Sequence, residues 1–127
     1  GGLKDKAVLV LGLSYRQDIG DTRHSPAETL VHALESQGVR VEGYDPLIDY
    51  WQEMNWVLPD VFPDPAGFDA VIFSTPHKEF KSLDVARWLG DARPVLLDTS
   101  NVLSVEKRNS CRKIGVRVES VGRGDGL

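Results

Sequence analysis

Residues 9–27, LVLGLSYRQDIGDTRHSPA, decide how the rest of the chain is organised. The stretch begins inside an apolar run, residues 7–13, which is short enough to be a strand buried on both faces. It ends on a helix start, because Ser25 can cap the first turn, Pro26 suits the first helical position and Glu28 can complete a capping box. Open α/β sheets bind ligands beyond the carboxyl ends of their strands, so we expect a site on the polar loop between the strand and the helix.

The composition is that of an ordinary globular domain. The chain has 127 residues, a net charge of −4 and a single cysteine, Cys111. This net charge argues against nucleic acid as a main partner, because neutralising phosphates needs a basic face. A single cysteine cannot form an internal disulfide, which suits a reducing cytoplasm. No apolar run approaches the ~20 residues of a membrane-spanning helix. We therefore expect a cytoplasmic domain with no nucleic-acid partner and no membrane association.

Strands and helices alternate along the chain. Apolar runs bounded by turn residues predict strands, and apolar residues at helical spacing, with Gly38 and Gly115 as stops, predict helices. Residues 47–65, which contain Trp51 and Trp56, predict a short helix and an irregular loop that either covers the sheet edge or meets another subunit. The predicted strands are 7–13, 39–44, 68–74, 94–98 and 116–121, and the predicted helices follow Ser25, span 83–89 and span 105–114.

This alternation predicts the fold class. Strands joined by helices form a parallel sheet covered on both faces, and right-handed crossovers favour a doubly wound arrangement. We expect an α/β protein with a Rossmann-like, doubly wound parallel sheet of about five strands and helices on both faces. Residues 1–127 then form a single domain, with 122–127 as a flexible glycine-rich tail. Because the chain begins at Gly1 without an initiator methionine, we expect a fragment of a longer protein.

The first turn lacks the glycines of a self-contained dinucleotide site. Such a site needs G-x-G-x-x-G so that the backbone can approach a pyrophosphate, whereas Gly12 here is followed by bulky residues. Asp45 stands at the end of the second strand, where these folds place a ribose-binding acid. Without the glycines, we predict that Asp45 organises a turn with Pro46.

Arg16 and Arg23 are the candidates for binding chemistry. Two guanidinium groups beside a helix N-terminus favour a phosphate or a carboxylate, because the forked donors and the helix dipole attract the same anion. The alternative is internal pairing, since the acids at Asp18, Asp21 and Glu28 lie near enough to neutralise both arginines. We expect Asp21 to orient Arg23.

The histidines and the cysteine show no pattern of a metal site or of a nucleophile. We expect His24 and His32 on the surface. His77 follows a strand's carboxyl end, where sites are built, although such a histidine more often bonds to backbone. Cys111 falls late in a predicted helix, which favours an inert, half-buried thiol over a catalytic one.

The stretch LGLSYRQDIGDTRHSPA resembles the start of the C-terminal domain of the UDP-glucose/GDP-mannose dehydrogenase family, whose pattern runs L-G-L-a-[YF]-K-x-x-x-x-D-x-R-x-S-P-A. The Ser-Pro-Ala ending is more similar to members that act on UDP-N-acetylhexosamines than to those that act on UDP-glucose. The resemblance continues along nearly the whole chain, at Gly38-Val39, Tyr44-Asp45-Pro46, 68–71, Thr75, His77, Glu79-Phe80, 97–99, Asn101-Val102 and Gly122-Arg123.

The resemblance implies a UDP-sugar-binding domain of an NAD-dependent nucleotide-sugar 6-dehydrogenase. Such an oxidoreductase takes the sugar C6 alcohol to a carboxylate for polysaccharide precursor biosynthesis. The implied partners are the UDP-sugar, the N-terminal NAD-binding domain and central helical domain of the same enzyme, and further copies in a homo-oligomer. NAD would be bound mainly by a domain absent from this chain. The family's nucleophilic cysteine lies upstream, so we expect this chain alone to be inactive.

The resemblance also assigns residues, none of them catalytic or metal-binding. Tyr15 and Arg16 occupy the positions that contact the nucleotide of the substrate. Arg23 matches an arginine that reaches across the interdomain cleft toward NAD, and Asp21 matches the acid that precedes it. Asn101 is a further candidate for substrate binding, although it can instead shape the turn after its strand.

Three positions depart from the family pattern. Arg16 replaces a lysine, which keeps the charge but turns a point donor into a planar fork. His24 replaces a glutamate, and Ser100 stands where many members place an arginine beside the substrate. The alternative function is therefore a non-enzymatic α/β interaction domain that has lost ligand binding.

Overall fold

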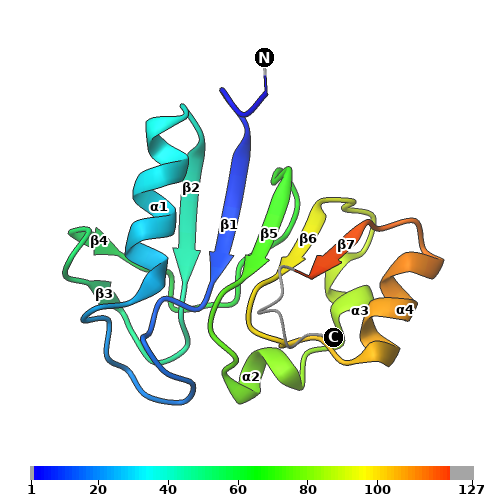
Figure 1. The fold of residues 1–127 in the computed structure, drawn as a ribbon. Coiled ribbons are helices and arrows are strands. Elements are labelled where there is room, and N and C mark those ends of the chain that lie inside the picture. Colours follow the sequence, from blue (N-terminus) through cyan, green and yellow to red (C-terminus); the bar gives the residue numbers. More distant parts are fainter. Residues whose placement is uncertain (1, 121–127) are drawn as a thin grey trace.

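Five parallel strands form the central sheet of the computed structural model, which describes residues 2–120. The spatial order is β2-β1-β5-β6-β7, and every neighbouring pair is parallel (Figure 1). The predicted tail, 122–127, lies outside the described residues. The strands of the sheet are β1 (Ala7–Leu11), β2 (Arg40–Tyr44), β5 (Ala70–Phe73), β6 (Val95–Asp98) and β7 (Val118–Ser120).

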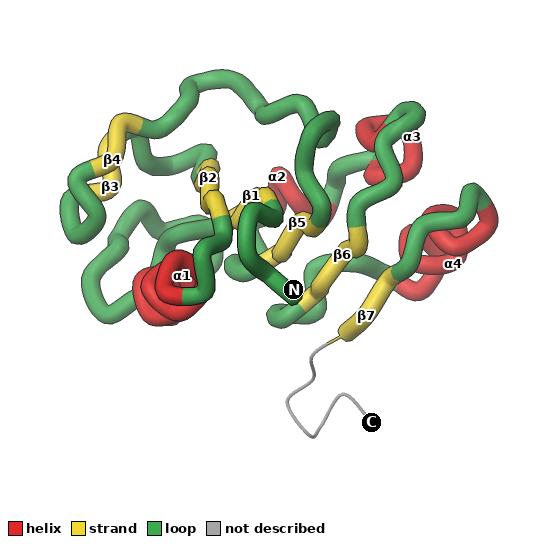
Figure 2. Tube along the Cα trace, turned by 90° about the horizontal axis from the view of Figure 1, so that it is seen from above, coloured by secondary structure: helices red, strands yellow, loops and turns green. Residues whose placement is uncertain are grey.

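Helices cover both faces of this sheet. Because side chains alternate along a strand, Val8 and Val10 of β1 face one layer while Leu9 and Leu11 face the other. The valines pack with α1 (Pro26–Ser36), and the leucines pack with α3 (Val85–Leu89) and α4 (Val105–Lys113). Figure 2 shows α1 on one side of the sheet and α3 and α4 on the other. The predicted doubly wound α/β fold is confirmed.

The start of α1 follows the prediction in part. Ser25 Oγ accepts a hydrogen bond from the Ala27 N–H at 3.1 Å, and Pro26 occupies the first helical position. The predicted capping box is wrong, because the Ser25 N–H donates to the Thr22 carbonyl at 3.2 Å instead of to Glu28. The Glu28 carboxylate lies 3.6 Å from Nε2 of His32, one helical turn further along the exposed surface.

Residues 47–65 do not form the predicted short helix. They contain an antiparallel hairpin of β3 (Tyr50–Trp51) and β4 (Trp56–Val57), in which Trp51 and Trp56 are paired. The two indole rings pack edge to face at 5.3 Å, and Trp51 is fully buried in the α1-side core. A side chain built on Gly43 of β2 would meet Trp56 at 3.6 Å, so the hairpin covers this edge of the sheet.

The connection after β5 contains a helix that the sequence did not predict. It is α2 (Lys78–Lys81), whose Phe80 is fully buried against Phe73 of β5. His77 occupies the N-cap position of α2, but its side chain forms no hydrogen bond to that helix. The imidazole is therefore available to residues outside the helix.

Candidate functional site

The carboxyl ends of β1 and β5 flank the point where the direction of winding reverses. The chain passes from β1 through α1 to β2 on one side, and from β5 through α2 and α3 to β6 on the other. Open α/β sheets bind ligands at such a switch point. The loop of residues 12–25, here called the β1–α1 loop, lies at this edge together with α2 (Figure 1).

Asp45, at the end of β2, fixes the first part of the β1–α1 loop. Its buried Oδ2 accepts hydrogen bonds from the N–H groups of Leu13 at 2.8 Å and Ser14 at 3.0 Å, and from the Ser14 hydroxyl at 2.8 Å. Its Oδ1 accepts from the Leu47 N–H at 2.9 Å, so the predicted turn role of Asp45 is confirmed. Burial alone would raise the pKa of Asp45, but the hydrogen bonds from His77 and from these backbone groups lower it.

The backbone around Gly12 does not fit a dinucleotide pyrophosphate. In a dinucleotide-binding turn, free N–H groups face the phosphates. Here the N–H groups of Leu13 and Ser14 already donate to the Asp45 carboxylate. The same bonds occupy the carboxylate, which therefore does not face a ribose. The prediction that the first turn is not a self-contained NAD site agrees with this geometry.

His77 and Thr75, which follow β5, hold the loop from the other side. The imidazole is only 1% exposed, its Nε2 lies 2.9 Å from Asp45 Oδ2, and its Nδ1 accepts a hydrogen bond from the Asp18 N–H at 2.7 Å. Because Nδ1 accepts, the proton of the neutral ring is on Nε2, which donates to Asp45. Thr75 Oγ1 donates to the Ser14 carbonyl at 3.0 Å. The expected backbone contact of His77 is present, but its link to Asp45 was not predicted.

Between these anchors, Tyr15 and Arg16 are exposed. The Tyr15 side chain is 52% exposed, and the guanidinium carbon of Arg16 lies 5.7 Å from the centre of its ring, which is a cation–π distance. Within residues 2–120 no carboxylate lies within salt-bridge distance of Arg16. The internal-pairing alternative is therefore wrong for Arg16, whose charge is available to a ligand.

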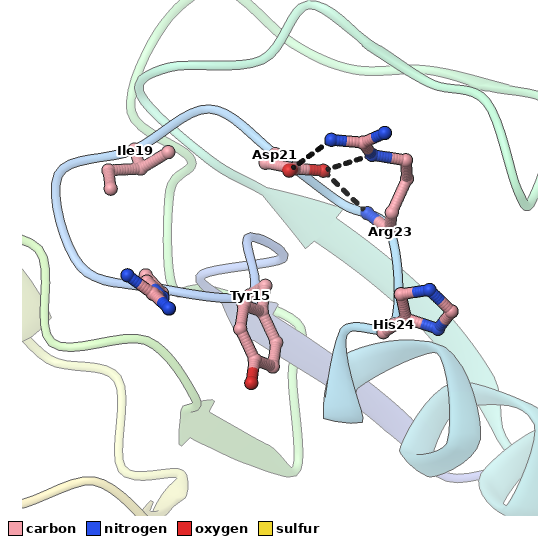
Figure 3. Close-up of a pocket in the computed structure, with 6 residues that line it drawn as sticks. Tyr15, Ile19, Asp21, Arg23 and His24 are labelled. Carbon is pink, nitrogen blue, oxygen red and sulfur yellow. Dashed lines mark hydrogen bonds and ion pairs between the residues drawn. The ribbon is translucent and has the colours of Figure 1, made fainter.

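Internal pairing does describe Arg23. Its Nε and Nη2 donate to the two carboxylate oxygens of Asp21 at 3.1 Å and 2.9 Å, and its backbone N–H donates to the same carboxylate at 3.0 Å (Figure 3). These bonds lower the pKa of Asp21 to about 2 and raise the pKa of Arg23. The Arg23 side chain remains 77% exposed. Asp21 thus orients Arg23 as predicted, and solvent screens the attraction between two side chains as exposed as these.

A surface hollow of about 540 Å³ runs along the β1–α1 loop. Its volume lies within the range of small-molecule sites. Most of the side chains around it are polar or charged, and Figure 3 shows Ile19 and His24 on either side of Tyr15. The lining residues all come from this one loop and are Tyr15, Arg16, Ile19, Asp21, Arg23 and His24.

Asn101 lies on the loop after β6, at the same edge of the sheet but outside this hollow. The turn that carries it is shaped by buried Asp98, whose carboxylate accepts from the N–H groups of Ser100, Val102 and Leu103 at 2.8–3.1 Å. Asn101 itself is exposed and adopts a left-handed conformation with φ of 57°. The Ser100 hydroxyl donates to the Ser74 carbonyl at 2.7 Å.

The remaining candidates do not join the loop. Cys111 is fully buried in α4, more deeply than the predicted half-burial, and burial followed by the charge of Asp84 raises the pKa of its thiol. This supports an inert thiol. No grouping of three metal-binding side chains, and no helix long and apolar enough to span a bilayer, occurs among residues 2–120.

Comparison with known proteins identifies relatives that match most of the chain. Residues 9–105 match the model of the UDP-glucose/GDP-mannose dehydrogenase family, UDP binding domain. A UDP-glucose 6-dehydrogenase of Rhizobium meliloti (strain 1021) is 33% identical over 132 residues, which cover 98% of this chain and 29% of that protein. A UDP-N-acetyl-D-mannosamine dehydrogenase of Methanocaldococcus jannaschii is 31% identical over 92% of this chain and 27% of its own length. The chain thus spans less than a third of these relatives.

Solved structures show the same fold. A UDP-D-ManNAc dehydrogenase of Pyrococcus horikoshii superposes with a TM-score of 0.68 at 26% identity, over 96% of this chain and 27% of that one. An NDP-N-acetyl-D-galactosaminuronic acid dehydrogenase of Methanosarcina mazei Go1 superposes with a TM-score of 0.76 over 94% of this chain and 25% of that one, at 22% identity.

Proposed function

The chain belongs to the UDP-binding domain of the UDP-glucose/GDP-mannose dehydrogenase family, and from this membership we propose that its β1–α1 loop binds the diphosphate of a UDP-sugar. The observation that carries the proposal is that the Arg16 side chain is exposed and unpaired with any carboxylate among residues 2–120. This residue lies at the switch point of the sheet. A planar guanidinium can donate two parallel hydrogen bonds to a phosphate.

The neighbouring residues fit the same ligand. Tyr15 presents an exposed ring and hydroxyl beside Arg16, which suits the ribose or the base of the nucleotide. Asn101 offers an exposed amide on the next loop along the same edge, where it can contact the sugar half of the substrate. Arg23, oriented by Asp21, is proposed to reach an NAD molecule held across an interdomain cleft.

In the longer enzyme, this domain supplies binding while the chemistry lies elsewhere. The proposed reaction oxidises the sugar C6 alcohol to a carboxylate with NAD as the oxidant. The occupied backbone around Gly12 and the buried Cys111 both support an NAD site and a nucleophile on other domains. We therefore propose residues 1–127 as one domain of a homo-oligomeric cytoplasmic dehydrogenase that includes an NAD-binding domain and a central helical domain. The chain alone is expected to be inactive.

Isothermal titration of the chain with UDP tests the binding role of Arg16. Replacing Arg16 by alanine removes its charge-assisted hydrogen bonds to phosphate; a single such bond is worth about 1.5–3 kcal/mol, so we expect the Kd for UDP to rise at least ~10-fold. Arg16→Lys keeps the charge but loses the planar fork, so its Kd for UDP should lie between those of the wild type and of Arg16→Ala. Arg40→Ala removes an exposed arginine at the opposite edge of the sheet and should leave the Kd unchanged.

The outcomes separate the two candidate functions. Equal Kd values for wild type and Arg16→Ala would place the diphosphate elsewhere. No heat from the wild-type chain at millimolar UDP would favour the interaction domain without a ligand. Weak binding by the wild type is itself expected, because a site shared between domains loses contacts when one half is absent.

A further inference from the structure

His77 is a buried imidazole whose two ring nitrogens contact two different parts of the β1–α1 loop. Nε2 bonds to Asp45, which holds the N–H groups of Leu13 and Ser14 before the exposed turn. Nδ1 accepts from the N–H of Asp18, which follows that turn. One ring therefore joins both ends of the segment that presents Tyr15 and Arg16.

The geometry of Asp18 explains why this contact is needed. Asp18 adopts a left-handed conformation with φ of 59°, which L-residues other than glycine populate only at a conformational cost. Its N–H donates to His77 Nδ1 at 2.7 Å, and its Oδ1 accepts from the Lys78 N–H at 3.0 Å at the start of α2. These two bonds offset the unfavourable conformation. Asp18 is thereby fixed against α2, although it lies on the exposed surface.

The imidazole is itself held rigidly. It is 1% exposed, and its ring lies 5.7 Å from that of Phe80, which is fully buried. Asp45 accepts from Nε2, so moving the proton to Nδ1 would break both hydrogen bonds of the ring, the one to Asp45 and the one from Asp18. The tautomer that accepts from Asp18 is the one that the surroundings select.

We propose that His77 is a positioning residue for nucleotide binding: its Nδ1 fixes the Asp18 amide and so sets the conformation from which Tyr15 and Arg16 meet the diphosphate. The proposal rests on the proposed UDP-binding function. His77 is not among the residues that line the hollow. It acts through the backbone of the loop, which is a role distinct from filling the core.

Two amide variants separate the two nitrogens. The amide oxygen of His77→Asn can take the place of Nδ1 and accept from Asp18, whereas the amide nitrogen of His77→Gln can take the place of Nε2 and donate to Asp45. In isothermal titration of the 127-residue chain with UDP, we expect the Kd to rise about tenfold in His77→Gln but only about twofold in His77→Asn, since one backbone hydrogen bond is lost or kept. Urea denaturation of both variants shows how far each stays folded.

A role in core packing alone would give a different pattern. The two variants would then weaken UDP binding equally, or in proportion to their loss of stability, and that result would overturn the proposal. Matched stability with a larger loss of affinity in His77→Gln would support it.

NMR of the ligand-free chain tests the contact apart from UDP. We expect the His77 ring in wild type to carry its proton on Nε2, with Nδ1 unprotonated. The Asp18 amide should exchange slowly with solvent in wild type and in His77→Asn, and rapidly in His77→Gln. A protonated Nδ1 or a fast-exchanging Asp18 amide in wild type would overturn the positioning role even where UDP binds. If wild type binds no UDP but shows both NMR signatures, the proposed function fails while the His77–Asp18 contact stands.

Discussion

Replacing Gly12 by alanine should lower the free energy of unfolding by about 3–5 kcal/mol. Gly12 has φ of 99°, a conformation that a residue with a side chain rarely adopts. A Cβ added there would lie 2.5 Å from the Thr75 backbone nitrogen and 2.6 Å from the Thr75 Cβ. Backbone cannot swing aside as a long side chain can, so β1 and β5 would have to separate where the site is built. Urea denaturation measures the change.

Gly67→Ala is the matched control for this substitution. Gly67 has a similar φ of 89°, but nothing lies within 4 Å of the added Cβ. Its replacement therefore reports the conformational cost without a steric overlap, and we expect a loss of about 1 kcal/mol. If Gly12→Ala costs no more than Gly67→Ala, the close approach of the first turn to Thr75 does not limit stability.

Replacing Asp45 by asparagine should cost about 2–3 kcal/mol at neutral pH. Oδ2 accepts from two backbone N–H groups, the Ser14 hydroxyl and His77, while Oδ1 accepts from Leu47. An asparagine must turn its NH₂ group toward one of these sets of donors, and it supplies no negative charge to the other. Asp64→Asn is the control and should change stability little, because the exposed Asp64 accepts a single hydrogen bond among residues 2–120, from the Ala66 N–H.

The cost of Asp45→Asn should depend on pH in a defined direction. The pKa of Asp45 in the folded chain is lowered, so its ionised form stabilises the fold above the unfolded pKa of about 3.9. That contribution is lost as the pH falls through the lower folded-state pKa. The difference in the free energy of unfolding between wild type and Asp45→Asn should therefore be constant from about pH 5 to pH 7 and should narrow below about pH 4. A gap that stays constant down to pH 2 would mean that the Asp45 charge does not stabilise the fold.

The sheet could be predicted because each strand carries its own signal. The apolar runs at 7–13 and 68–74 can be recognised from their own residues, and Ser25-Pro26 alone predicts the start of a helix. The hairpin could not be predicted in this way. Its strands are two residues each, too short for an alternating pattern, and its stability comes from Trp51 entering a core that exists only after folding.

Part of the candidate site could be predicted from the sequence and part could not. Arg16, Arg23 and Asp21 could be proposed from their place after the first strand and from the family resemblance. The link between Asp45 and His77 could not, because these residues are 32 positions apart and meet only when β2 and β5 flank β1. Their types and strand-end positions were visible in the sequence. The side-chain geometry by which the His77 ring contacts both Asp45 and Asp18 was not visible there.

The central claim is that the β1–α1 loop forms the diphosphate site, and an NMR titration of the isotopically labelled chain with UDP tests it most directly. We expect the backbone amides that shift on adding UDP to lie in residues 14–24 and in the neighbouring turn after β6. In Arg16→Ala, these shifts should require higher UDP concentrations to develop. Shifts confined to the opposite edge of the sheet, or no shifts at millimolar UDP, would contradict the account.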